Sequence, residues 1–484
     1  MMKLVVRPIL WAFVAVLLVL TPSGAGATPK PPLLADAQRP RSQYLELAGE
    51  RNIEERTALL RATIRLSRAD TVFFQSDGTY RPQGPSAANI HIAVDGRKSS
   101  TDSLVDWRTS EQPTAHPFDA VGALRLRAGR HTVELIAEPV SWLPLCVNHD
   151  CTPVGAASPG GSFVVTAANL SVLVHPAMRV VSRVLDSDRG PFDLGTAGLL
   201  TPDNTLTGPL PFAELLSATV QRGAAAVALG SGWLYAAAPL SSDAMVTFVV
   251  DGRHPGNRSA SWANQDLWRG AETRGPLSTQ MFLLPHAQVR HVALATVEFP
   301  WASTWVPGQP DNPAVYSVAT GTGMTVLSGG MTVAGSTTSS YDGSPNSSGI
   351  GVGSSTGDPY SAPVGTNVEL ASANVYVPRR HSGVVMFSAK SRTHGGDGFD
   401  TGWTSNGTIS MWITIDGKRR GPVVFQEVAS PGNSGSQRSI AVSYLAAGRQ
   451  ALVPGYHRVR VLGRADGSFF HAWMWRDLPL VWFD

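Results

Sequence analysis

Cysteine and lysine are both scarce in this chain of 484 residues. Only two cysteines occur, Cys146 and Cys151, and only five of the 39 basic residues are lysines. Two cysteines are too few for a small scaffold built on disulfides. An excess of one charge is also lacking, because 39 basic residues stand against 36 acidic ones. This balance gives no reason to expect nucleic acid as a partner.

Long apolar runs are missing after the first residues. Lys3 and Arg7 precede a short apolar segment at residues 9–20, and Ala25-Gly26-Ala27 follows with small side chains. This is the pattern of a signal peptide, which we expect to span residues 1–27 and to be cleaved before Thr28. No later stretch is long and apolar enough to span a membrane as a helix. The sequence therefore predicts a secreted, extracellular protein without membrane insertion.

The two cysteines enclose only four residues. In an oxidising compartment, this spacing predicts a local disulfide between Cys146 and Cys151. Closing so short a ring is worth about 2 kcal/mol on the chain-entropy model. The alternative is a zinc site with His149, but it lacks a fourth ligand nearby and needs reduced thiolates outside the cell. We expect no metal and no cofactor.

Apolar residues with the sustained period of a helix are absent as well. Instead, apolar and polar residues alternate along short segments. The apolar residues Leu60, Ala62, Ile64 and Leu66 alternate with polar ones, which places them on one face of a strand. Short runs of this kind recur among 48 glycines and 35 prolines. The pattern predicts an all-β protein of sandwiches or barrels.

An internal repeat organises the chain. Three times, a strand-like run ends in Asp-Gly, and a second run led by histidine follows about forty residues later. The copies are Asp95-Gly96 with His131, Asp251-Gly252 with His291, and Asp416-Gly417 with His457. Asp-Gly suits a tight turn between strands, so we interpret the aspartates as turn residues rather than metal ligands. A histidine at one place in three copies is expected to serve the fold of each copy.

The spacing of the copies predicts tandem domains, because a repeat of this length is too long for a solenoid. We expect repeat one at residues 28–180, repeat two at 181–335 and repeat three at 366–484. Residues 336–365 are rich in Gly and Ser and predict a linker between the last two.

The turn that precedes the histidine carries a resemblance. Residues 124–131, Leu-Arg-Leu-Arg-Ala-Gly-Arg-His, follow a strand that ends in Val-Asp-Gly, and Gly455-Tyr456-His457 repeats part of the motif. In the second copy, Val289 stands where a glycine is expected. The arrangement resembles the jelly-roll domains of the tumour-necrosis-factor and complement-globular-head type, which also occur in bacterial and phage surface proteins. The resemblance implies three tandem antiparallel jelly-roll-like β-sandwiches, and such domains often trimerise through aromatic faces.

Tryptophans in repeat three are the main indication of function. Trp412 has the opposite parity to Ile409, Met411, Ile413 and Ile415, so it is expected to point away from the face that those four bury. A last strand from Phe469 to Phe483 would place Phe469, His471, Trp473 and Trp475 on one face, and Phe470, Ala472 and Met474 on the other. The candidate ligand-binding residues are Trp403, Trp412, Trp473 and Trp475. Exposed aromatic faces bind sugars or pack against another subunit, and coverage within the protein is the open alternative.

No catalytic residues are predicted, because no serine has His and Asp in a convincing frame and no carboxylates pair along one strand face. The sequence favours a secreted, non-enzymatic β-sandwich protein that binds a surface or a ligand, with carbohydrate as the candidate ligand. One alternative is a structural extracellular protein that assembles into a homo-oligomer. Another is a secreted hydrolase with a site between repeats.

Overall fold

The computed structural model describes most of the chain after residue 41. The described residues are 42–83, 86–107, 114–140, 143–147, 150–154, 162–175, 178–192, 212–237, 243–252, 261–263, 273–299, 315–335, 349–354, 361–377, 384–396, 406–429, 436–447, 450–469, 471–475 and 479–483. The predicted signal peptide lies outside them. Residues 40–484 form one compact unit.

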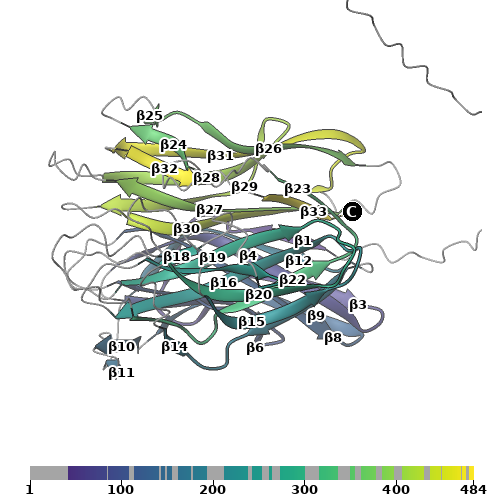
Figure 1. The fold of residues 1–484 in the computed structure, drawn as a ribbon. Coiled ribbons are helices and arrows are strands. Elements are labelled where there is room, and N and C mark those ends of the chain that lie inside the picture. Colours follow the sequence, from purple (N-terminus) through teal and green to yellow (C-terminus); the bar gives the residue numbers. More distant parts are fainter. Residues whose placement is uncertain are drawn as a thin grey trace, which may run out of the picture. The chain divides into compact units, whose positions relative to one another are not determined.

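The described part of the chain contains strands and no α-helix (Figure 1), which confirms the predicted all-β class. Almost all strand pairs are antiparallel; the exception is β24 with β25. Alternation explains why these segments are strands, since β31 (Gly455–Ser468) buries every second side chain along most of its length. Each repeat has two sheets, which we call inner and outer.

In repeat one, the inner sheet has the order β1-β12-β4-β8, and the outer sheet has the order β3-β9-β5-β6. The strands of these two sheets are β1 (Gln43–Glu46), β3 (Thr57–Leu66), β4 (Asp70–Pro82), β5 (Ser86–Val94), β6 (Arg97–Lys98), β8 (His116–Leu126), β9 (Gly129–Val140) and β12 (Phe163–Leu173). The short strands β2 (Arg51–Ile53) and β7 (Ser103–Trp107) extend them, and β10 (Leu143–Val147) pairs with β11 (Asp150–Val154) as a separate hairpin.

Repeat two has the same arrangement. Its inner sheet contains β13-β22-β16, with β19 paired to β16 on the other side and β21 and β14 as an extension, and its outer sheet has the order β15-β20-β17-β18. The strands are β13 (Arg179–Val184), β14 (Arg189–Phe192), β15 (Phe212–Val220), β16 (Ala226–Ala237), β17 (Asp243–Val250), β18 (Ser261–Ala263), β19 (Thr273–Leu283), β20 (Arg290–Phe299), β21 (Val315–Val318) and β22 (Gly323–Ser328).

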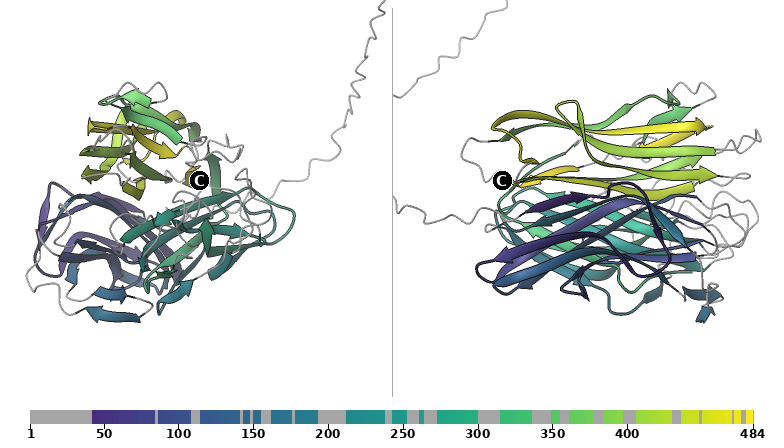
Figure 2. Two further views of the ribbon diagram at one scale, coloured as in Figure 1. Left: turned by 60° about the vertical axis from the view of Figure 1, so that its left-hand side comes forward. Right: turned by 180° about the vertical axis from the view of Figure 1, so that it is seen from behind.

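Repeat three follows the same order once more. Its inner sheet is β25-β24-β32-β27-β30, and its outer sheet is β26-β31-β28-β29. The strands are β24 (Gly349–Ser354), β25 (Ser361–Pro363), β26 (Val368–Val377), β27 (Val385–Gly396), β28 (Asn406–Ile415), β29 (Lys418–Ala429), β30 (Ser436–Ala446), β31 and β32 (His471–Trp475). The two views of Figure 2 show the strands of each repeat gathered by colour: purple to blue, teal, and green to yellow.

Two segments differ from the sequence prediction. The range predicted as a linker contains β24, which pairs with β32 and so forms part of the inner sheet of repeat three. β23 (Met331–Gly335), in the range predicted for repeat two, pairs with β33 (Pro479–Phe483) at the end of the chain. The high content of Gly and Ser predicted a linker. Backbone hydrogen bonds to a distant strand nevertheless make part of this range a strand.

The single last strand predicted from Phe469 to Phe483 is wrong. The chain leaves the outer sheet after Ser468, enters the inner sheet as β32, and then pairs with β23 as β33. Gly467, at a φ of 126°, lies just before this crossing. Phe469 consequently shares the core with Ala472 and Met474, although parity along one strand placed it on the opposite face.

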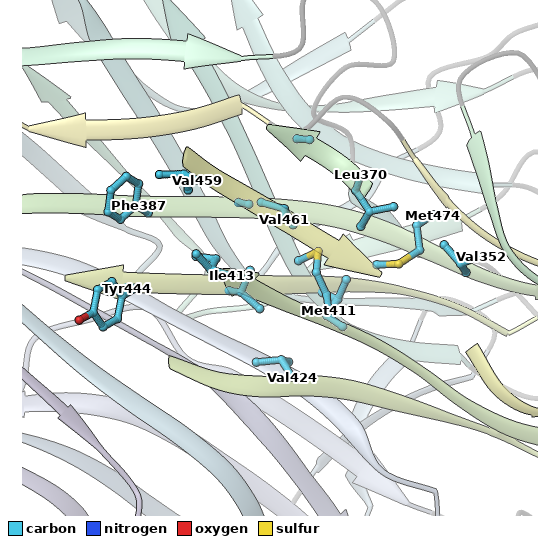
Figure 3. Close-up of a cluster of buried hydrophobic side chains, with 14 of the residues drawn as sticks. Val352, Leu370, Phe387, Met411, Ile413, Val424, Tyr444, Val459, Val461 and Met474 are labelled. Atoms are coloured by element: carbon cyan, nitrogen blue, oxygen red, sulfur yellow. The ribbon is translucent and has the colours of Figure 1, made fainter. Parts of the chain in front are cut away.

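Each pair of sheets encloses its own core. The core of repeat three contains Phe387, Met411, Ile413, Val461 and Met474, all at most 1% exposed (Figure 3). Separate clusters fill repeats one and two. A fourth cluster draws on the inner sheets of all three repeats: Phe73, Val121 and Leu173 from repeat one, Val227, Leu229 and Leu327 from repeat two, and Val384, Met386 and Leu445 from repeat three. We call it the shared cluster.

The three Asp-Gly turns are equivalent, as the repeat predicted. Asp95, Asp251 and Asp416 have φ values of 49°, 51° and 51°, and the glycine after each also has a positive φ. Aspartate and glycine tolerate this left-handed backbone, which the tight turn requires.

The histidine of the motif binds the turn aspartate in two of the three repeats. His131 Nδ1 donates to Asp95 over 2.8 Å, and His457 Nδ1 donates to Asp416 over 2.7 Å. In repeat two, Arg290 occupies this position and its Nε donates to Asp251. His291 is offset by one residue and gives only its backbone N–H to Asp251, so its predicted equivalence with His131 and His457 is wrong.

Candidate functional site

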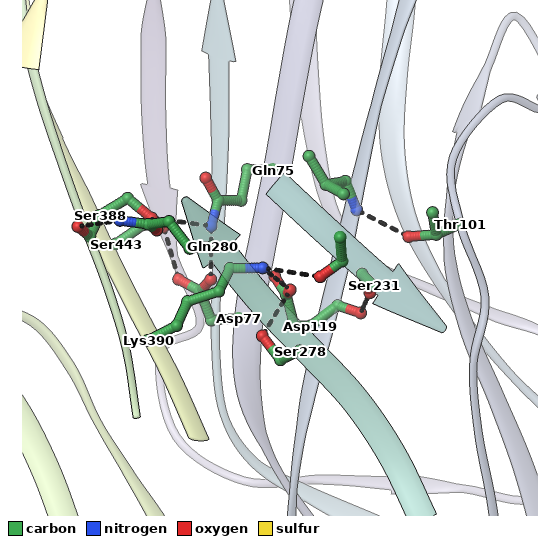
Figure 4. A network of polar contacts seen from close by, with 12 residues as sticks. Gln75, Asp77, Thr101, Asp119, Ser231, Ser278, Gln280, Ser388, Lys390 and Ser443 are labelled. Atoms are coloured by element: carbon green, nitrogen blue, oxygen red, sulfur yellow. Dashed lines mark hydrogen bonds and ion pairs between the residues drawn. The ribbon is translucent and has the colours of Figure 1, made fainter. Parts of the chain in front are cut away.

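A buried group of polar side chains lies where the inner sheets of the three repeats meet (Figure 4). We call it the polar centre, and it consists of Gln75, Asp77, Asp119, Asn169, Ser231, Ser278, Gln280, Ser388, Lys390 and Ser443. None of these side chains was singled out from the sequence.

Hydrogen bonds in the polar centre join every pair of repeats. Ser278 Oγ of repeat two donates to Asp119 Oδ2 of repeat one over 2.9 Å. Ser388 Oγ of repeat three donates to Gln280 Oε1 of repeat two over 2.9 Å. Asn169 Nδ2 of repeat one donates to the Ser443 carbonyl of repeat three over 3.0 Å. The three repeats are thus bonded to one another through their inner sheets.

Asp77 is surrounded by donors. Its Oδ2 accepts from Asn169 Nδ2 at 2.8 Å and from Ser443 Oγ, and its Oδ1 accepts from Gln75 Nε2 at 3.0 Å. Complete burial and then the neighbouring charge of Asp119 raise the pKa of Asp77 to about 6, although the hydrogen bonds and Lys390 oppose the shift. A carboxyl group of this kind can bind and release a proton near neutral pH.

Lys390 is the cation of the polar centre. Its Nζ forms an ion pair with Asp119 Oδ2 and donates to the Gly230 carbonyl over 3.1 Å. Both side chains of the ion pair are 2% exposed. Desolvation of two such charges costs several kcal/mol per ion, so their attraction and hydrogen bonds must offset a large penalty.

Corresponding strands supply different chemistry to the polar centre. The direct cross-strand pairs are Asp77 with Asp119 on β4 and β8, Ser231 with Ser278 on β16 and β19, and Lys390 with Ala441 on β27 and β30. The two carboxyl groups, the two hydroxyl groups and the one amine of these pairs can therefore bind one another. If all three repeats carried the acidic pair or the lysine, like charges would repel in the buried site.

A second feature is the solvent face of the outer sheet in repeat three. Ile409, Met411, Ile413 and Ile415 are at most 2% exposed, whereas Trp412 is half-buried on the other side of β28, as its parity predicted. Trp412 lies opposite Leu462 on β31 and at a register shift between β28 and β29.

Along β31, polar and aromatic residues continue this face. Tyr456 is 78% exposed and contacts Tyr376, 52% exposed, with ring centroids 4.9 Å apart. Between Tyr456 and Leu462 stand Arg458 and Arg460, which both pair with Glu369 at 3.4 and 3.6 Å. We call Tyr376, Tyr456, Arg458, Arg460, Leu462 and Trp412 the outer strip. From Tyr456 to Leu462 it extends about 20 Å at the usual rise per strand residue.

The equivalent positions in the other repeats lack these aromatic residues. In each repeat, one strand residue gives its backbone N–H to the turn aspartate: Thr132, His291 and Arg458. Two residues before it stand Arg130 in repeat one, Val289 in repeat two and Tyr456 in repeat three. His91 and Thr247, at 3% and 0% exposure, take the place of Trp412 four residues before the turn. The outer strip is therefore specific to repeat three.

The other predicted site residues are placed only in part. Trp403 lies outside the described residues. The backbone of Trp473 lies in β32 between Gly351 and His394, and that of Trp475 lies opposite Gly349. Cys146 and Cys151 are direct partners in the β10–β11 hairpin, a register that suits a disulfide because opposed Cα atoms in antiparallel strands are about 4.5–5.5 Å apart.

Among the described residues, no three His, Cys, Asp or Glu side chains converge as a metal site. No helix long and apolar enough to cross a membrane occurs in the same ranges.

Comparison with known proteins yields distant likenesses among solved structures. No protein-family model matches the chain, and no curated protein does. Among solved structures, it is similar to the tandem CBM22-1–CBM22-2 domain of Paenibacillus barcinonensis Xyn10C, at 10% identity and a TM-score of 0.16, over 58% of this chain and 92% of that one. It is also similar to a chain of the lipid-containing bacteriophage PM2, at 9% identity and a TM-score of 0.16, over 91% of this chain and 99% of that one. At these TM-scores, neither likeness decides a function.

Proposed function

We propose that this protein is a secreted, non-enzymatic binding protein whose outer strip holds an extracellular carbohydrate. The single observation that supports the ligand site most strongly is the exposed Tyr376–Tyr456 pair on the same sheet face as Trp412. Aromatic faces stack on the apolar side of sugar rings. Arg458 and Arg460 add fixed donors for hydroxyl or carboxylate groups between the aromatic residues.

The scaffold behind this site consists of three jelly-roll-like β-sandwiches. In each repeat, the first strand of the inner sheet pairs with the last, and the order of the four main strands is the same, which supports this topology. The jelly rolls that the sequence resembles often trimerise. Here the shared cluster and the polar centre would replace a homotrimer by three repeats of one chain.

This arrangement bears on the two alternative functions. A homo-oligomer would have to use surfaces other than the inner sheets, because the shared cluster covers these within the chain. A hydrolase that used the acids between the repeats would need substrate to reach them, but Asp77 and Asp119 are 0% and 3% exposed. The single binding face of repeat three therefore leads us to favour ligand binding.

A glycan array with the mature protein tests the proposal, followed by titration calorimetry on the best ligand. Tyr456→Ala and Trp412→Ala are each expected to weaken binding by about tenfold or more, as interface aromatic residues commonly do, with little change in Tm for the exposed Tyr456. Val289→Ala, at the equivalent exposed position of repeat two, is the matched control and should bind like the parent. Absence of any bound glycan, or equal affinity in all variants, would refute the carbohydrate site.

A further inference from the structure

The ion pair between Lys390 and Asp119 brings an amine and a carboxyl group together inside the protein. It joins β27 of repeat three to β8 of repeat one, and its two side chains are 2% exposed. Lys390 is one of only five lysines in the chain. Where water is excluded, transfer of one proton from ammonium to carboxylate removes both charges. Such a transfer would leave a neutral amine beside a carboxylic acid, which are the two reactants of an amide condensation.

The surroundings of Asp119 distinguish its two carboxyl oxygens. Oδ2 accepts the hydrogen bond of Ser278 Oγ at 2.9 Å, while Oδ1 is buried with no hydrogen-bond partner among the described residues. On the other side, the Gly230 carbonyl, 3.1 Å from Nζ, restrains the lysine. The amine therefore lies against the Asp119 carboxyl group. Oδ2 of that group is held by a hydrogen bond from Ser278, whereas Oδ1 accepts no hydrogen bond from the described residues.

A second buried carboxyl group lies directly across the sheet from Asp119. Asp77 is the cross-strand partner of Asp119, and such partners have Cβ atoms about 4.5–5.5 Å apart. Burial and the Asp119 charge raise the pKa of Asp77 to about 6, so it can both donate and accept a proton near neutral pH. Asn169, Ser443 and Gln75 hold its carboxyl group in place.

We propose that Lys390 and Asp119 form an intramolecular isopeptide bond, with Asp77 as the proton carrier. The lone pair of the neutral Nζ attacks Cγ of the protonated Asp119, and the Nζ–Cγ bond forms. Asp77 accepts a proton from the nitrogen and delivers one to the departing hydroxyl of Oδ1. The Cγ–Oδ1 bond breaks, one water leaves, and Oδ2 becomes the amide carbonyl with Ser278 as donor. No oxidant, reductant or further reactant is needed.

The bond would link repeat one to repeat three covalently across 271 positions of the chain. Such a link restricts the unfolded chain as a disulfide does, and reducing agents do not break it. It also removes two buried charges whose desolvation is costly. The polar centre is thereby assigned a chemical role besides hydrogen bonding between repeats.

Mass spectrometry of the purified mature protein, which is expected to begin at Thr28, tests the proposal. After denaturation and reduction, we expect the polypeptide to weigh one water molecule less than its sequence. Because Asp-Gly sequences can also lose water, protease digestion must locate the loss in a pair of joined peptides that contain Lys390 and Asp119. Separate, unmodified peptides for both residues in the wild-type protein would overturn the proposal, leaving an ion pair only.

Three variants separate the roles. Lys390→Met should keep the full mass, and Asp77→Asn should leave Lys390 and Asp119 unjoined, or nearly so, in folded protein. Lys98→Met, which removes a half-exposed lysine paired with Asp102, is the control and should retain the joined peptides. If Asp77→Asn still yields complete joining, Asp77 is not the proton carrier. If a variant does not fold, the wild-type digest alone decides whether the bond exists.

Discussion

At the scale of residues, the turn aspartates link two strands of each outer sheet. Asp95 and Asp416 each accept a hydrogen bond from the side chain of the motif histidine. Each also accepts one from the backbone N–H of the residue that follows this histidine. Both ring nitrogens of His457 face acceptors, because Nε2 lies 2.7 Å from the Val453 carbonyl. This geometry favours the doubly protonated ring.

The protonated ring makes stability depend on pH. Burial lowers the pKa of His457, but its bonds to Val453 and Asp416 outweigh burial and raise it above 6.5. The bond from His457 holds the pKa of Asp416 below 3.8. The histidine contributes fully below about pH 6.5 and loses its contribution as pH rises through its raised pKa, whereas the aspartate contributes above about pH 3.8.

We therefore expect His457→Gln to destabilise the protein more at about pH 5.5 than at about pH 8.5. The difference is expected to be about 0.5–1 kcal/mol, because solvent screens the half-exposed Asp416. Arg290→Gln is the matched control, since a guanidinium stays charged throughout this range. Denaturant unfolding at both pH values measures the free energies. Equal losses for His457→Gln at both would contradict the assignment.

At the scale of elements, alternation identified the strands but could not show where one ends inside a continuous aromatic run. The break after Ser468 leaves the local pattern intact while moving the chain to the other sheet. Parity is therefore reliable for Trp412, in the middle of β28, and failed for Phe469, at a crossing.

The β10–β11 hairpin is predicted to contain a disulfide. Because Cys146 and Cys151 are opposed in register, we expect them to be bonded to one another in the protein isolated without reductant. Alkylation without reductant should then label neither thiol, and reduction should add two labels. Cys146→Ser with Cys151→Ser should lose about 2 kcal/mol of stability on the chain-entropy model. Two labels in the unreduced sample would show that the bond is absent.

At the scale of the whole molecule, the shared cluster predicts that repeats one to three unfold together. Leu445 is 0% exposed and belongs to this cluster, so Leu445→Ala should cost about 2–5 kcal/mol. We expect the variant to lower one common calorimetric transition. Val461→Ala, inside the core of repeat three alone, is the comparison. A transition that splits into three independent ones in the parent would contradict the shared cluster.

The sequence by itself determined the all-β class, the three equivalent Asp-Gly turns and the side of β28 on which Trp412 lies. These follow from local rules: alternation sets the face of a side chain, and positive φ selects Asp and Gly. It misplaced the histidine of repeat two by one residue, because Arg290 can bind the aspartate equally well.

Only the tertiary structure decided what Asp77, Asp119 and Lys390 do. In the sequence, each is a single polar residue in a strand, indistinguishable from one that faces solvent. Their meeting requires inner sheets from repeats one, two and three to pack together, and no local pattern encodes which distant strand will lie opposite. Burial then changes the chemistry, because charges that are ordinary at a surface become reactive or costly once water is excluded.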